Sequence, residues 1–104
     1  MTDRDLQVQP WMGEEAPSEA DLRRTLDEEG LAPYRWSNGP GDVYGAHTHP
    51  YHKVIYVVRG SITFGLPGQR IELQAGDRLE LPGETRHDAV VGPDGVVCLE
   101  AHRR

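Results

Sequence analysis

The spacing of apolar residues changes at Gly30. Before it, Leu22 and Leu26 lie four residues apart, on one face of a helix. After it, apolar and polar residues alternate over short runs, which is the period of strands that bury one face. The pattern predicts one short helix over 18–30 and an all-β region over 31–104.

The helix carries signals at both ends. Ser18 suits the N-cap, Asp21 occupies the reciprocal capping position, and Gly30 suits the C-terminal cap. Because the apolar stripe is narrow, we expect the helix to pack on the outside of the core.

The β region divides into short strands separated by turns rich in Gly and Pro. Several short strands at regular spacing are typical of a sandwich or small barrel. The predicted strands are 33–37, 43–49, 53–59, 61–66, 69–74, 77–81, 86–91 and 96–101. Alternation assigns these side chains to the core: Ile55, Val57, Ile62, Phe64, Ile71, Leu73, Leu79, Leu81 and Leu99.

Residues 1–17 show no sustained apolar period, and we expect an irregular arm. Residues 1–30 hold nine acidic and three basic residues, a net charge of −6, which equals the net charge of the whole chain. The acidity therefore belongs to the N-terminal part. Trp11 is expected to anchor the arm on the barrel or on a second subunit, and a homodimer is expected.

Composition excludes several classes of protein. The 104 residues suit one domain. The sequence lacks the basic stripe expected of a nucleic-acid-binding protein. No apolar run reaches the roughly 18 residues of a membrane span. No signal-peptide pattern appears, and Cys98 is the only cysteine, so we expect a cytoplasmic protein with Cys98 as a core filler.

Three histidines are candidate metal ligands. Residues two apart on a strand face the same side, so His47 and His49 present two imidazoles together. A third histidine from a neighbouring strand can complete a triad with open positions for substrate and water. Imidazole suits Zn, Fe, Ni and Cu. His52 would face outward to solvent, unless Pro50 resets the parity and makes it a substitute ligand; His102, in the terminal tail, is assigned no role.

The spacing of these residues resembles two motifs of the cupin superfamily. Residues 41–60 read G-x5-H-x-H-x3-K-x6-G, and residues 76–87 read G-x5-P-x-E-x2-H. The cupin pattern has Glu where this chain has Lys53, Gly where it has Glu84, and Asn where it has Val91. The resemblance covers roughly residues 41–91.

The resemblance implies a double-sheet β-barrel, or jelly roll, with a divalent transition metal (Zn, Fe, Ni or Mn) at its mouth. In cupins two His and a Glu of the first motif and a His of the second hold the metal. Carried over, the ligands are His47, His49 and His87, and the glutamate has no counterpart.

Lys53, the only lysine, decides whether a metal occupies the site and what charge the site carries. An ammonium about 4 Å from a divalent ion is repelled by roughly 8 kcal/mol at intermediate dielectric. Deprotonating a lysine at pH 7 costs roughly 4.6 kcal/mol. Lys53 therefore goes neutral, turns away, or pairs with a carboxylate, for which Glu84 is the expected candidate; otherwise no metal binds. If a metal binds, a small anionic ligand would supply the missing negative charge.

Three functions fit these residues. The first is a metal-dependent dioxygenase or isomerase acting on a small anionic compound, with Lys53 or Tyr51 as the acid or base. The second is a module that binds or senses a small molecule without turnover. The third is a metal-free structural cupin with Lys53 in an ion pair. Four further residues are expected near the mouth without a definite place: Arg35, Trp36, Tyr44 and Tyr56.

Overall fold

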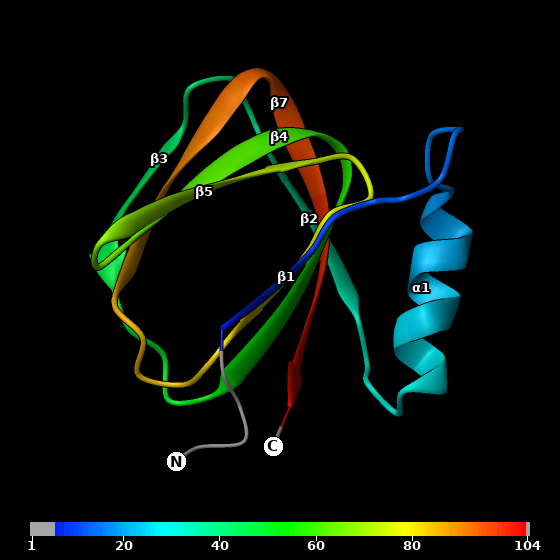
Figure 1. Cartoon of the computed structure of the whole chain (residues 1–104), viewed down its shortest axis with the longest axis horizontal. Coiled ribbons are helices and arrows are strands. Elements are labelled where there is room, and N and C mark those ends of the chain that lie inside the picture. The colour runs from blue at the N-terminus through cyan, green and yellow to red at the C-terminus, as the bar shows by residue number, and fades with distance from the viewer. Residues whose placement is uncertain (1–5, 104) are drawn as a thin grey trace.

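The computed structural model describes residues 6–103. In that range the elements are β1 (Gln7–Gln9), α1 (Glu19–Glu28), β2 (Tyr34–Asn38), β3 (Val43–His47), β4 (His52–Leu66), β5 (Gln69–Gln74), β6 (Arg78–Leu81) and β7 (His87–Arg103). Figure 1 shows the strands curving around a central space, with α1 beside them. The predicted fold, an all-β double-sheet barrel with one short helix, is confirmed.

Two long strands, β4 and β7, build both layers of the barrel. The first half of β4 pairs with β6 and with the second half of β7. Its second half pairs with β5 and with the first half of β7. The strand order is β1-β6-β4-β7-β2, with β5 added on β4 and β3 on β7. The sheet therefore folds back on itself, and the predicted breaks after 59 and 91 are bends inside continuous strands.

The bend of β4 depends on Gly60. Its φ is 82°, a conformation that costs a glycine little. A Cβ at Gly60 would overlap the carbonyl oxygen of Gly95 on β7, which also has positive φ. The two strands cross closely here, and the pairing register shifts on both sides of Gly60.

The sheet buries apolar side chains on both faces. The barrel interior contains Ile55, Val57, Ile62, Phe64, Leu73, Leu79, Ala89, Val91, Val96 and Cys98. The outer face packs against α1 through Leu22, Leu26, Val54, Tyr56, Val58, Val97 and Leu99. Leu99, predicted in the interior, lies under the helix because Val96 and Cys98 take the inward parity of β7.

The helix forms as predicted. Ser18 Oγ accepts a hydrogen bond from the Asp21 backbone N at 3.3 Å, and Gly30 has φ 80° just beyond the C-cap. Both leucines of its apolar face are buried. Within residues 6–103 no helix is long and apolar enough to cross a membrane.

The N-terminal arm is not irregular throughout. Its residues 7–9 form β1, an antiparallel partner of β6. Trp11 lies over Gly76, where an added Cβ would meet its ring, and its backbone N donates to Asp77 Oδ1 at 2.9 Å. Sequence periodicity missed β1 because it has only three residues and all of them are exposed. Trp11 anchors the arm on its own barrel.

A cluster of charged side chains ties the end of α1 to the sheet. Arg78 on β6 contacts Glu29 at 2.7 Å and Glu80 at 2.9 Å. Arg103 on β7 also contacts both carboxylates. His52 Nε2 lies 2.8 Å from Glu80 Oε1. His52 thus faces outward from the barrel as predicted, but it is buried against Glu80 and does not face solvent. We call these five residues the Arg78 cluster.

Candidate metal centre and its cavity

The three predicted histidines meet at one end of the barrel. His47 ends β3 and is the register partner of His87 at the start of β7. His49 lies in the following loop, and its ring centroid is 4.6 Å from that of His47 and 5.3 Å from that of His87. One nitrogen from each ring falls within 4.8 Å of the others. This spacing suits a single metal ion between them.

Hydrogen bonds at Nδ1 orient the rings. His47 Nδ1 lies 2.6 Å from the Gly45 carbonyl, and His87 Nδ1 lies 2.8 Å from the Thr85 carbonyl. A carbonyl only accepts, so each Nδ1 carries the proton and each Nε2 keeps its lone pair. Fixing the distal nitrogen in this way is typical of metal-binding histidines.

The site has unsatisfied nitrogens that a metal would satisfy. His49 Nε2 and His87 Nε2 are buried and have no hydrogen-bond partner. Burial lowers the pKa of both rings; nearby positive charge adds to this at His49, and at His87 burial outweighs the hydrogen bond to the Thr85 carbonyl, which raises the pKa. Neutral imidazoles with free, converging lone pairs are the form that binds Zn or Fe. The residues therefore fit a divalent transition metal.

His49 reaches the site from a loop held at two points. Its carbonyl accepts a hydrogen bond from the Glu84 backbone N at 2.6 Å. A Cβ at Gly83 would approach the Pro50 carbonyl oxygen at 2.9 Å, so the two loops touch. The predicted strand over 43–49 ends at His47, yet His49 still joins the triad because of this loop contact.

Lys53 points into the same cavity and pairs with Glu100, not with Glu84. Lys53 Nζ lies 3.4 Å from Glu100 Oε2, and both side chains are largely buried. Glu84 is exposed and has φ 63°, an uncommon conformation at the position where cupins have glycine. The predicted position near the mouth suggested Glu84, but Glu84 is exposed, and the carboxylate beside Lys53 is that of Glu100.

Glu100 is held by three further side chains. Trp36 Nε1 donates to Oε1 at 2.9 Å, Tyr34 OH donates to Oε2 at 2.7 Å, and His102 Nε2 lies 2.8 Å from Oε2. Burial raises the pKa of this carboxyl, but Lys53 and these hydrogen bonds outweigh burial and lower it. Glu100 is therefore a buried carboxylate with several partners.

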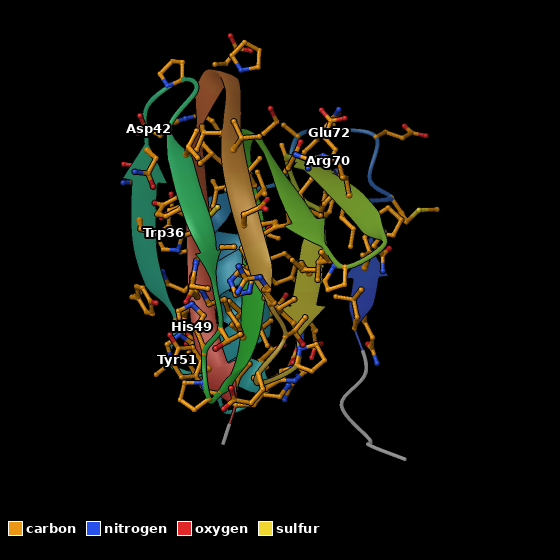
Figure 2. All side chains as sticks on the ribbon, turned by 90° about the vertical axis from the view of Figure 1, so that its left-hand side faces the viewer. Trp36, Asp42, His49, Tyr51, Arg70 and Glu72 are labelled. Carbon is orange, nitrogen blue, oxygen red and sulfur yellow. The ribbon has the colours of Figure 1, made fainter. Side chains whose placement is uncertain are left out.

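Tyr51 connects the triad to the Glu100 side of the cavity. Its hydroxyl lies 3.1 Å from His49 Nδ1, and its ring stacks on His49 and on His102, with centroids 4.9 Å and 3.8 Å away. Burial and then Glu100 raise its pKa, so the phenol is protonated at neutral pH. Figure 2 shows His49, Tyr51 and Trp36 on one side of the barrel, away from Arg70 and Glu72 on β5.

A cavity of about 340 Å³ joins these groups. Its floor is apolar and its walls are polar. The lining residues are Tyr34, Trp36, Tyr44, His47, His49, Tyr51, Lys53, Ile55, Ile62, Phe64, His87, Ala89 and Glu100. Of the residues expected near the mouth, Trp36 and Tyr44 line the cavity, whereas Tyr56 packs under α1 and Arg35 pairs with Glu19 outside.

Sequence reasoning missed Glu100 and His102. Glu100 follows Val96 and Cys98 at the same inward parity of β7, and a charged residue at an inward position was the available signal. His102 continues that parity on β7 and stacks on Tyr51, which lines the cavity. Cys98 is buried as predicted, and burial raises its thiol pKa to about 12, so it is no nucleophile at neutral pH.

Comparisons with known proteins agree with this architecture. The chain is 32% identical to KdgF from Halomonas sp., with a TM-score of 0.58 over 71% of this chain and 70% of that one. A structure of the DMSP lyases RdDddP and RnDddQII gives 27% identity and a TM-score of 0.66, covering 71% of this chain and 38% of that one. The polyketide cyclase RemF from Streptomyces resistomycificus gives 25% identity and a TM-score of 0.60, covering 69% of this chain and 54% of that one. No curated protein matches the sequence.

The match to a protein family covers the β region itself. The cupin domain family matches residues 34–100, from the start of β2 to the carboxylate that pairs with Lys53. This range includes both histidine motifs and most of the barrel. The chain belongs to the cupin family.

Proposed function

We propose that the protein is a metal-dependent enzyme that transfers a proton on a small anionic compound, as an isomerase does. The observation that carries the proposal is the position of Lys53. It lies in one cavity with three histidines whose Nε2 atoms converge and are free to bind a metal. The site thus combines a place for a metal with a side chain able to exchange a proton.

His47, His49 and His87 would hold a divalent ion through Nε2. A metal in such a site acts as a Lewis acid and polarises an oxygen of the bound compound. Three histidines without a carboxylate leave open positions for that oxygen, as in catalytic zinc sites with three protein ligands.

The chain's own groups then bind the compound and move the proton. Lys53 Nζ attracts the anionic group and is placed to give or accept a proton. Tyr51 keeps its hydroxyl proton at neutral pH and donates to an oxygen at the mouth. The apolar floor formed by Ile55, Ile62 and Phe64 keeps water from the reacting atoms.

Two similar structures support non-oxidative chemistry. One is named for lyases and the other for a cyclase, and eliminations and ring closures involve proton transfers. This chain spans only part of each of those proteins, so their substrates are not carried over. Neither of these names suggests oxygenation, the other reaction expected from the sequence.

Two measurements test the proposal. Elemental analysis should find a stoichiometric transition metal that His47→Ala and His87→Ala each lose, while His52→Ala, outside the triad, keeps it. Exchange of deuterium from D2O into a panel of small hydroxy acids and oxo acids, followed by NMR, should require Lys53. Oxygen consumption with the same panel would point to a dioxygenase instead. Binding without exchange would point to a sensing module.

A further inference from the structure

The Lys53 ammonium has N–H donors that its contact with Glu100 does not use. An ammonium offers three N–H groups. Its counter-ion Glu100 is 3.4 Å away, longer than the roughly 2.7–2.9 Å of a charge-assisted hydrogen bond. Within residues 6–103 no hydrogen bond from Nζ is formed in the cavity, so its N–H groups are available to a ligand.

Glu100 cannot compete for a ligand or a metal. Trp36, Tyr34 and His102 occupy its two oxygens with hydrogen-bond contacts, and it is 4% exposed. It does not belong to the group of side chains close enough to share an ion. Its contribution is to fix Lys53 and to neutralise it while the cavity holds no anion.

A count of charges in the cavity defines the ligand. Lys53 and Glu100 cancel, and the three histidines are neutral when they bind a metal. A divalent ion then leaves a net charge of about +2 in a largely buried space. The volume of about 340 Å³ equals that of roughly eleven water molecules, at about 30 Å³ each.

We propose, on the basis of the function inferred above, that the ligand is a short aliphatic compound with two carboxylates. One carboxylate binds the spare N–H groups of Lys53, and the other end lies at the metal centre. The short carbon chain packs on the floor formed by Ile55, Ile62 and Phe64. Glu100 is the positioning residue that orients Lys53.

The test compares two probes of similar shape by isothermal titration calorimetry. Zinc-loaded wild-type protein should bind succinate at least tenfold more tightly than its monoanionic monomethyl ester. A hydrogen bond to a charged group is typically worth about a tenfold change or more. In Lys53→Gln the dissociation constant of succinate should rise about tenfold and the preference between the probes should disappear, with zinc content unchanged.

Control variants separate the anchor from folding and from general charge. Lys53→Gln/Glu100→Gln removes both buried charges, so it loses the preference without leaving Glu100 unpaired. Lys53→Arg should keep the preference. Arg24→Gln, on the exposed face of α1, loses the same charge elsewhere and should bind succinate like the wild type.

The outcomes distinguish this proposal from the function on which it rests. Protein that takes up no zinc contradicts the metal centre, and with it the ligand proposal, before any probe is added. Zinc-loaded protein contradicts the Lys53 anchor alone if it binds the two probes equally or binds neither. Unchanged succinate affinity in Lys53→Gln contradicts it as well.

Discussion

The Arg78 cluster should make the protein sensitive to acid through Glu80. Burial raises the pKa of this carboxyl, but hydrogen bonds from His52, Arg78 and Arg103 outweigh it and lower the pKa from 4.5 to about 2. A folded-state pKa below the unfolded value gives stability that is complete above the unfolded pKa and is lost as pH falls toward the folded pKa.

The size of the effect follows from the pKa difference. About 2.5 pH units at roughly 1.4 kcal/mol each amount to about 3 kcal/mol of unfolding free energy from Glu80 at neutral pH. Linkage places most of the loss between about pH 4.5 and pH 2, with about 2 kcal/mol gone by pH 3.

Urea unfolding at pH 7, 4.5 and 3, followed by tryptophan fluorescence, measures this loss. Glu80→Gln should be less stable at pH 7 by about 3 kcal/mol, and its stability should fall less steeply with acid than that of the wild type. Glu72→Gln, an exposed carboxylate on β5, is the matched control and should follow the wild type. Parallel curves for Glu80→Gln and the wild type would refute the reasoning.

Three further outcomes are expected. Glu84→Gly should raise the unfolding free energy by up to about 1 kcal/mol in the same assay, because glycine adopts φ 63° without strain; a loss of stability would contradict this. Cys98 should resist iodoacetamide in folded protein at pH 8 and react in urea, as read by intact mass. Deleting residues 1–17 should lower the melting temperature, because β6 loses β1; size-exclusion chromatography of the same variant tests the expected homodimer.

The sequence predicted the parts of the site that depend on chain spacing. His47 and His87 occupy register partners on β3 and β7, and alternation predicts such positions well. His49 was placed for a different reason from the one expected, since a loop contact with Glu84, and not strand parity, carries it to the triad.

What the sequence left open depends on contacts between distant strands. The partner of Lys53 is Glu100, which is set by the pairing of β4 with β7 and is far away in the chain. Leu99 took the outer face because the inward parity of β7 changes between Val91 and Val96, where its pairing register with β4 shifts. The sequence marked the break at residues 92–95, but not which parity of the following run faces inward.

His52 and Lys53 are neighbours on β4 and lie on opposite faces of the strand. His52 belongs to the Arg78 cluster, and Lys53 faces the cavity. A slip of β4 by one residue would exchange them, since every side chain of a strand changes face. The exchanged arrangement would still pair a cation with Glu80, so electrostatics alone would tolerate it. Gly60 opposes it: a slip of one residue brings Arg59 or Ser61 opposite Gly95, and either would carry a Cβ into that carbonyl. Gly60 therefore fixes the register of β4, and which side chain of this strand faces the cavity depends on a residue that carries no side chain.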